Sequence, residues 1–579
     1  MSEASRPAHS PRTAFRLVCV ASAALLLLVA AWWVWTAVRA VETATQLLAA
    51  DAATTRLSAA VTAGDRDAAT AAGAALAGEL SAAADTADDP IWVIAARAPV
   101  VGGDIDALRT LLRSLRPLAS ESTPLVAALA SGTWDQSVDL TPLVQDAERA
   151  RTALAHIDTA PLLPPVGRAV ERVRDALEQG VPVLRTAAAV EPLLRALDGP
   201  APTRILVLLQ NNAEVRTGGG ITGSFLQITS QAGVLTLDAQ ASSSDFAPRA
   251  TPVADVPPDL ATLYGDVVGR FVQNTTIPAD FAVSARLASA WWQSRGGAAP
   301  DLIVSVDPLV LAAALQVIGP VQLADGSTLT SGDAIDRLLV EPYRALDADG
   351  QTALMQDAAA RVFAGLAAAP ADPLTWMSAL SGPIASGSIS AWAADADTQD
   401  ALSRGLLGGP SARLAAAGPD AFGLWLNDAT GGKMDGYLDI DIATTVASCR
   451  PDGRADIAVQ LTMSSTAPAD AAHSLPGDVT GHGMYGTAVG DIGTSVAVAA
   501  PPGTFLVSVS KDGASLPVAT AVESGRPTSL VRVNLSPGER NEIRFAFVAA
   551  EPGAVAPEVV HTPLLNVPDV TAPVIRGCD

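Results

Sequence analysis

A polar, glycine-rich stretch of this chain, QNNAEVRTGGGITG at Gln210–Gly223, holds residue types that suit the binding of an anion. An arginine such as Arg216 can bind a phosphate through two parallel hydrogen bonds. Consecutive glycines can turn their backbone N–H groups toward one anion as a nest. We therefore expect a ligand-binding loop here, with a contribution from a second loop at Ser242–Phe246. The expected ligand contacts are Asn211, Asn212, Gly218, Gly219, Gly220 and Ser244.

Two acidic residues in these loops, Glu214 and Asp245, could hold a Mg²⁺ ion, because this ion prefers oxygen ligands and substrate phosphates. A metal ion beside Arg216 would stabilise the charge that develops during phosphoryl transfer. On this interpretation Arg216, Glu214 and Asp245 are the catalytic residues and Mg²⁺ is the cofactor. In the alternative interpretation, Glu214 and Arg216 form a structural ion pair, and the glycines provide positive φ angles in a turn without any ligand.

Apolar runs on both sides of the motif predict the elements that would position it. Arg204–Leu209 predicts a buried strand before the loop, and Ser224–Thr229 with Val234–Ala239 predicts a hairpin after it. Leu302–Val306 predicts another strand, and the dipeptide Asp307-Pro308 after it is typical of a helix N-cap and first helical residue. Strands that alternate with helices favour an α/β domain with a mixed sheet.

An uncharged apolar segment at Leu17–Val38 is long enough to cross a bilayer, and Trp32, Trp33 and Trp35 lie near its end. Arginines precede this segment, whereas acidic residues soon follow it. The positive-inside rule therefore predicts a single-pass protein with a cytoplasmic N-terminus and the bulk of the chain outside the cell. A cleaved signal peptide is the alternative interpretation.

The organisation of the chain predicts a multidomain α+β protein. Helical spacing, interrupted by prolines, dominates before residue 198, whereas short strand-like runs between Pro and Gly turns dominate after residue 424. The predicted segments are 1–16 as a cytoplasmic N-terminus, 17–38 as a transmembrane helix, 39–198 as a helical stalk or bundle, 204–420 as an α/β domain and 424–579 as an immunoglobulin-like β-sandwich.

The net charge of −23 argues against nucleic acid as a partner, because phosphate backbones attract clustered Lys and Arg. Lys433 and Lys511 are the only two lysines. Outside the predicted membrane segment there are two cysteines, Cys449 and Cys578, near the two ends of the last predicted domain. They could form a disulfide that clamps the C-terminus or remain free thiols, because spacing alone does not decide the geometry.

Several segments resemble the DUF4012 family of actinobacteria and related bacteria, a family without an assigned function. The resemblance is carried most specifically by ILVLLQNNAEVRTGGGITGSF (Ile205–Phe225). It extends over Ile91–Arg109, Asp301–Gly326, Ser390–Gly408 and the terminal β-rich region. The resemblance implies a membrane-anchored protein that faces the cell envelope.

The order of elements around the motif is also similar to that of the LytR-CpsA-Psr family. Those extracytoplasmic enzymes transfer glycopolymers from a polyprenyl-pyrophosphate carrier to peptidoglycan with Arg and Asp residues and Mg²⁺. Their first strand ends in an Asp-x-Arg-like element, which Glu214 and Arg216 would match here. An Arg-Asp pair follows their hairpin, but Ser244 and Asp245 stand at that place, so the second arginine is missing.

The sequence therefore favours an anchored extracytoplasmic protein that binds a cell-envelope glycopolymer, or its lipid-linked pyrophosphate precursor, and assists polymer assembly. One alternative is a phosphotransferase that attaches the polymer to the cell wall. The other is a structural or scaffolding protein of the envelope that makes its contacts through the β-sandwich and has no small-ligand site.

Overall fold

The computed structural model describes residues 42–576 with gaps. The gaps fall at 43–44, 47–48, 51, 58, 61–64, 99–100, 123–138, 198–200, 233, 369–372, 448–449, 554 and 572. The predicted membrane segment Leu17–Val38 and both cysteines of the predicted disulfide lie outside the described residues. Within the part that is described, no helix combines the length and the apolar character needed to cross a bilayer.

The chain divides into two compact units, Met1–Ala188 and Ala189–Asp579. The described elements of the first unit are helices: α2 (Arg66–Ala87), α3 (Pro90–Ala95), α4 (Gly102–Glu121), α6 (Thr141–Ala155) and most of α7 (Pro164–Leu197). Leu112 of α4 packs against small alanines of α2, which allow the two helices to approach closely. The Arg109 side chain of α4 donates to the backbone carbonyl of Ala87 at 3.0 Å. The sequence analysis set the end of this helical region at residue 198.

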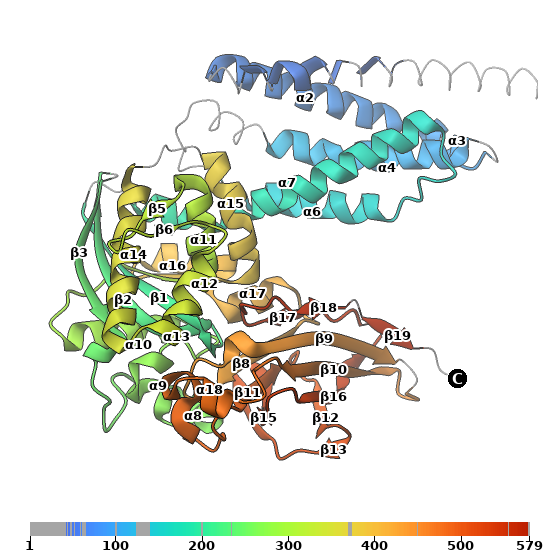
Figure 1. Ribbon diagram of the computed structural model, residues 1–579. Helices are drawn as coiled ribbons and strands as arrows, with labels where there is room; N and C mark the ends of the chain where they lie inside the picture. Colours follow the sequence, from blue (N-terminus) through green and yellow to red (C-terminus); the bar gives the residue numbers. More distant parts are fainter. Residues whose placement is uncertain are drawn as a thin grey trace, which may run out of the picture. The chain divides into compact units, whose positions relative to one another are not determined.

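The second unit begins with a mixed β-sheet, as the sequence predicts (Figure 1). Its strands lie in the order β3-β2-β1-β4-β7, with β1 parallel to β4 and the other neighbours antiparallel. The strand bounds are β1 (Thr203–Arg216), β2 (Gly219–Gln231), β3 (Val234–Ser242), β4 (Leu302–Val306) and β7 (Ile389–Ala393), with a small separate hairpin of β5 (Val321–Gln322) and β6 (Thr328–Leu329).

Both faces of this sheet are covered, because the continuous apolar run Ile205–Leu209 of β1 places apolar side chains on each face in turn. Leu206 and Leu208 contribute to one cluster with Trp291 and Trp292 of α10, whereas Ile205 contributes to another on the opposite face. The helices are α8 (Pro258–Tyr264), α9 (Val267–Arg270), α10 (Phe281–Ser294), α11 (Pro308–Ile318), α12 (Ala334–Leu339), α13 (Glu341–Ala345), α14 (Ala348–Ala368), α15 (Pro373–Ser386), α16 (Ala396–Arg404) and α17 (Pro410–Ala416). Short 3₁₀ turns are η1 (Ser243–Asp245), η2 (Val272–Asn274) and η3 (Leu406–Gly408).

The C-terminal part of the second unit consists of two sheets that share one hydrophobic core, so it is a β-sandwich (Figure 1). One sheet has the order β13-β12-β16-β10-β9-β18, with β19 also on β9, and the other has the order β14-β15-β11-β8-β17. The strands are β8 (Phe422–Asp428), β9 (Leu438–Ala447), β10 (Arg454–Ser465), β11 (Ile492–Ala499), β12 (Phe505–Lys511), β13 (Ala514–Ser515), β14 (Ala519–Glu523), β15 (Arg526–Leu535), β16 (Arg540–Pro552), β17 (Val559–His561), β18 (Asp569–Val570) and β19 (Val574–Arg576). Between them lie η4 (Asp435–Tyr437), α18 (Ala471–Ser474), α19 (Gly477–Thr480) and η5 (Gly481–Gly483).

The motif at Gln210–Gly223 is not the loop that the sequence analysis expects. Strand β1 continues to Arg216 and β2 begins at Gly219, so only Thr217 and Gly218 form the turn. The register of this hairpin shifts between Leu209 and Gln210, and again between Asn211 and Val215. Such irregularities increase the local twist of a strand and redirect its side chains. The polar composition of the motif therefore marks an irregular, buried hairpin end.

The predicted disulfide between Cys449 and Cys578 can be tested by peptide mapping. Ala447 of β9 and Arg576 of β19 are partners in a parallel pair, and each cysteine follows one of these partners by two residues in the sequence. We expect digestion without reductant to release one cross-linked peptide with both cysteines, which separates on reduction. Recovery of two alkylated cysteine peptides from unreduced protein would contradict the disulfide.

Candidate functional site

The residues of the glycine-rich motif that the sequence analysis assigns to a ligand site lie in the interior of the protein. All residues from Gln210 to Thr222 are buried, and Asn212 and Thr217 have no solvent exposure. A phosphate or pyrophosphate group therefore has no direct access to the motif in this structure.

Four hydrogen bonds hold the guanidinium group of Arg216 within the protein. Its Nη2 donates to Glu214 Oε1 at 3.0 Å and to Asn274 Oδ1 at 3.0 Å, and its Nε donates to the same Asn274 oxygen at 3.1 Å. Its Nη1 donates to the carbonyl of Val215 at 2.8 Å. A bound phosphate would have to displace these partners, because the two-pronged geometry that suits a phosphate is already used.

The carboxylate of Glu214 is held between two cations. Its second oxygen, Oε2, accepts from Lys433 Nζ at 2.6 Å, in addition to the Arg216 bond on Oε1. Burial would raise the pKa of Glu214, but the charges of Lys433 and Arg216 outweigh burial and hold this pKa below its ordinary value. The pKa of Lys433 is raised, since the charge of Glu214 outweighs the opposing effect of burial. Glu214 and Lys433 are therefore both charged at neutral pH.

The consecutive glycines of the motif lie where β2 turns back close to the backbone of β1. A Cβ atom on Gly220 would lie 2.2 Å from the carbonyl oxygen of Asn211, and Gly219 adopts a φ angle of 130° that favours glycine. Gly218 N–H donates to the carbonyl of Thr276 at 3.0 Å, and Gly220 N–H donates to Gln210 Oε1 at 2.9 Å. These two donors of the predicted anion nest are thus already satisfied inside the fold.

Asn211 and Asn212 connect β1 to the helices α13 and α11. Asn211 Nδ2 donates to the hydroxyl of Tyr343 on α13, and Asn212 Nδ2 donates to Asp307 Oδ2 at 3.0 Å. Asp307 is the N-cap of α11, since its Oδ1 accepts from the N–H of Leu309 at 2.9 Å, which confirms the helix start predicted from the sequence. Burial raises the pKa of Asp307 to about 6.

The end of β1 also bonds directly to the β-sandwich. Val215 N–H donates to Asp435 Oδ2 at 2.7 Å, and Thr217 N–H donates to Asn427 Oδ1 at 3.0 Å. We call this contact between residues 210–220 and residues 427–435 the β1 junction. It joins the part of the second unit that contains the mixed sheet to the part that contains the sandwich.

The β1 junction contains more acidic groups than its two cations neutralise. Asp428 accepts from the N–H groups of Thr430 and Gly431 at 2.9 and 2.7 Å, and burial together with the charge of Glu214 raises its pKa to about 6. Burial and the charge of Asp428 raise the pKa of Asp435 well above its ordinary value. The other oxygen of Asp435, Oδ1, is buried without a hydrogen-bond partner. With both aspartates ionised, the three carboxylates exceed the two cations by one charge, so protonation of one aspartate makes the junction neutral.

A further buried carboxylate connects the part of the second unit that contains the mixed sheet to the part that contains the sandwich. Glu523 of β14 accepts from the N–H of Ala279 at 2.9 Å, and burial raises its pKa to about 7. Its second oxygen has no hydrogen-bond partner and is buried. Glu523 thus behaves as the aspartates of the β1 junction do.

The second predicted loop lies in a different environment. Asp245 is about half exposed, pairs with Arg295 at 3.2 Å and accepts from the N–H of Ser242 at 2.9 Å. Ser242 Oγ accepts from the backbone N–H of Ser244 at 3.4 Å, which completes a local helix cap, and it also accepts from the Ser244 hydroxyl at 3.0 Å. The structure therefore brings Glu214 and Arg216 together and gives Asp245 its own cation. The catalytic assignment of these three residues stays a prediction.

No group of three or more His, Cys, Asp or Glu residues with the geometry of a metal site occurs in the described part of the chain. A Mg²⁺ ion held by Glu214 and Asp245 also stays a prediction. Both oxygens of Glu214 would have to exchange a lysine and an arginine for the metal, so the residues present do not fit that role.

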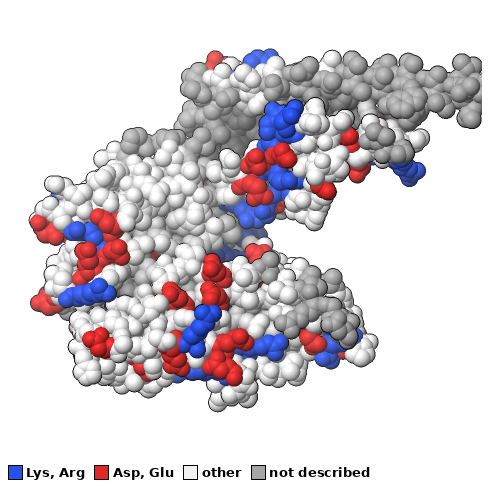
Figure 2. Space-filling view, turned by 45° about the vertical axis from the view of Figure 1, so that its right-hand side comes forward, with Lys and Arg blue, Asp and Glu red and all other residues white. Residues whose placement is uncertain are grey.

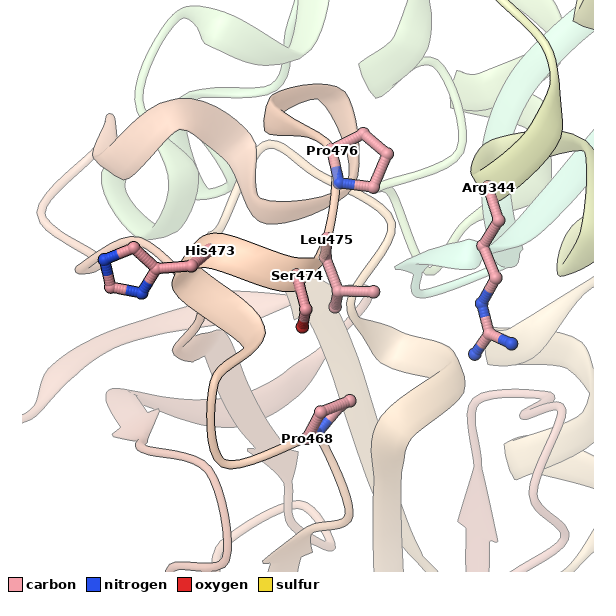
Figure 3. A pocket seen from close by; sticks show the side chains of 6 residues that line it. All are labelled: Arg344, Pro468, His473, Ser474, Leu475 and Pro476. Carbon is pink, nitrogen blue, oxygen red and sulfur yellow. The ribbon is translucent and has the colours of Figure 1, made fainter.

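Sequence reasoning missed the residues that complete the β1 junction from the sandwich, Asp428, Lys433 and Asp435. Lys433 carried a usable signal, because it is one of only two lysines and stands between a Gly pair and an Asp. It also missed an open cleft of about 570 Å³ on the second unit (Figure 3). The cleft is lined by Arg344, Pro468, His473, Ser474, Leu475 and Pro476.

The two lysines of the chain offer a matched test of the β1 junction. Lys433→Met leaves the charge of Glu214 with one cation in a buried site, so we expect the free energy of unfolding to fall by about 2–4 kcal/mol. Lys511→Met removes a partly exposed pair with Glu539, so we expect a loss of at most about 1 kcal/mol. Chemical denaturation of the full chain followed by tryptophan fluorescence measures both. Equal losses for the two variants would contradict the structural role of Lys433.

The buried carboxylates predict a pH dependence of stability. Asp307 and Asp428 have pKa values of about 6 and Glu523 of about 7 in the folded protein, above their ordinary values. Between their unfolded and folded pKa values, only the folded state binds these protons, so stability rises as the pH falls. Burial lowers the pKa of His561, which opposes this trend through a single group.

We expect the free energy of unfolding to increase by about 2–4 kcal/mol between pH 8 and pH 5. Chemical denaturation at intervals of one pH unit would measure this increase. A flat profile, or one that falls steadily over this range, would contradict the proposed protonation of the buried carboxylates.

Comparison with known families identifies the region around the β1 junction. Residues 200–343 match a family model described as "Protein of unknown function (DUF4012)". The match includes β1, β2, β4 and α11, whereas the resembling segments Ile91–Arg109 and Ser390–Gly408 lie outside it. Neither the curated proteins nor the solved structures yield a match, and the similarity to the LytR-CpsA-Psr family is not confirmed. The family model thus confirms the resemblance to DUF4012 over residues 200–343.

Proposed function

We propose that this protein is a membrane-anchored, extracytoplasmic binding protein that holds a cell-envelope glycopolymer or its lipid-linked pyrophosphate precursor. It assists envelope polymer assembly by binding and does not itself transfer the polymer. The observation that carries this proposal is that Arg216, Glu214 and the N–H groups of Gly218 and Gly220, which phosphoryl transfer would need, bond to other groups of the protein.

The pairing favours binding over transfer for a chemical reason. A transfer site needs cations and N–H donors that are free to strengthen their interactions as charge develops in the transition state. Here the donors of Arg216, Gly218 and Gly220 already bond to protein acceptors, and Glu214 is neutralised by Lys433 and Arg216. These residues are suited to hold two parts of the protein in a fixed arrangement.

The envelope location is supported by the sequence. The segment Leu17–Val38 has the length and the flanking charges of a membrane anchor with the bulk of the chain outside. A protein fixed to the outer surface of the membrane meets lipid-linked polymer precursors and growing glycopolymers. The DUF4012 match adds no activity of its own, because its description assigns none.

Asp245→Ala separates a binder from a transferase. Asp245 is half exposed, so its removal leaves the fold intact, yet the transferase alternative makes it catalytic. Full-length protein in nanodiscs would be incubated with a polyprenyl-pyrophosphate-linked glycan, Mg²⁺ and peptidoglycan as the acceptor. We expect the wild type and the variant to retain the glycan equally and to release no polyprenyl phosphate or pyrophosphate.

Release of the carrier by the wild type and its loss in Asp245→Ala would establish the transferase alternative. Failure of the wild type to retain either the precursor or the finished polymer would contradict binding and favour the scaffolding alternative.

A further inference from the structure

The open cleft beside α13 combines the cation of Arg344 with walls that carry both polar and apolar side chains. Arg344 forms one side, and Pro468, Leu475 and Pro476 lie on the other (Figure 3). Its volume of about 570 Å³ falls in the range of sites that bind small molecules or short polymer segments. The two sides come from α13 and from the chain around α18, which both belong to the second unit.

Arg344 is held in place but keeps capacity for a ligand. Its Nη2 donates to the hydroxyl of Tyr437 at 2.7 Å, and Tyr437 is a neutral partner that leaves the charge of the guanidinium uncompensated. A guanidinium has five N–H donors, so this bond uses only part of them. The side chain is exposed, whereas the preceding Tyr343 is buried and bonds to Asn211 of the β1 junction.

Many exposed arginines of this protein lie in a different setting. In Figure 2 the Lys and Arg side chains on the visible face stand beside Asp and Glu in mixed groups. Arg361 of α14 is one example among the exposed arginines, since it pairs with Asp357 at 3.1 Å. The carboxylate of Asp357 neutralises the charge of Arg361, whereas Arg344 bonds to the phenol group of Tyr437.

The wall opposite Arg344 is fixed by local hydrogen bonds. Ser474 N–H donates to the carbonyl of Asp470 at 2.9 Å, and Leu475 N–H donates to the carbonyl of Ala471 at 3.1 Å. The Ser474 hydroxyl donates to the Asp470 carboxylate at 3.1 Å. In Figure 3 the ring of His473 points away from Arg344, so Arg344 is the group that faces an anion in the cleft.

We propose that this cleft binds an anionic group, phosphate or carboxylate, of a cell-envelope glycopolymer, with Arg344 as the group that contacts the anion. The inference rests on the proposed function and locates its contact site away from the glycine-rich motif. The proline and leucine wall offers an apolar surface to the C–H faces of the sugar or polyol units between the charges. Because the wall and Arg344 are already positioned, binding requires little ordering of the protein.

The experiment uses the full chain in detergent micelles and three polymer probes. Poly(glycerol phosphate) carries phosphates, polygalacturonate carries carboxylates, and dextran carries neither. We expect at least one of the two anionic probes to bind and dextran not to bind. Arg344→Ala should weaken the binding of that probe about tenfold, because a hydrogen-bonded charge pair is lost. Arg344→Lys should lie between the wild type and Arg344→Ala, since lysine keeps the charge without the planar fork.

Arg361→Ala is the matched control, because it removes an exposed arginine that already has a carboxylate partner. Its affinity should equal that of the wild type, and all variants should unfold at the wild-type temperature. If the wild type binds an anionic probe and Arg344→Ala binds it equally, the cleft is not the site and the proposed function stands. If dextran binds as well as the anionic probes, the anionic preference is overturned. If no polymer and no lipid-linked precursor binds, the proposed function itself fails.

Discussion

The carboxylate of Glu214, held between Arg216 and Lys433, is the interaction on which the arrangement of the second unit depends. Two charges from one strand and one from a residue 219 positions away in the sequence meet in a largely buried site. Charges in such a site are costly unless each is paired and hydrogen-bonded, so this cluster is stable in one arrangement only. That requirement gives the mixed sheet and the β-sandwich a defined relative position.

The same cluster explains why a strand carries so polar a sequence. The polar side chains of this strand bond to different neighbours: Gln210 to Ser305 on β4, Asn211 to Tyr343 on α13 and Asn212 to Asp307 at the start of α11. Glu214 bonds to Lys433, and the backbone N–H of Val215 donates to Asp435 in the sandwich. The glycines then let β2 return against β1 with a backbone separation that a Cβ atom would prevent. The motif therefore acts as a structural connection between parts of the second unit.

Much of the local fold follows from the sequence. Leu302–Val306 is a strand with the predicted bounds, Asp307 caps α11 as its type and position predict, and the hairpin after the motif forms where turn residues separate alternating runs. The site was harder to predict, because a polar run near glycines has the same composition in an exposed loop and in a buried junction. What distinguishes the two is the partner, and Asp435 lies 220 residues from Val215 in the sequence. Sequence spacing carries no information on such contacts.

A double-mutant cycle between Glu214 and Lys433 tests the central claim most directly. The free energies of unfolding of the wild type, Glu214→Gln, Lys433→Met and the double variant give the coupling energy of the pair. If the pair joins the two parts of the second unit, the sum of the losses of unfolding free energy in the two single variants should exceed the loss in the double variant by about 2 kcal/mol or more. Losses that simply add, to within about 0.5 kcal/mol, would show that the two residues act independently and would contradict the structural role assigned to the motif.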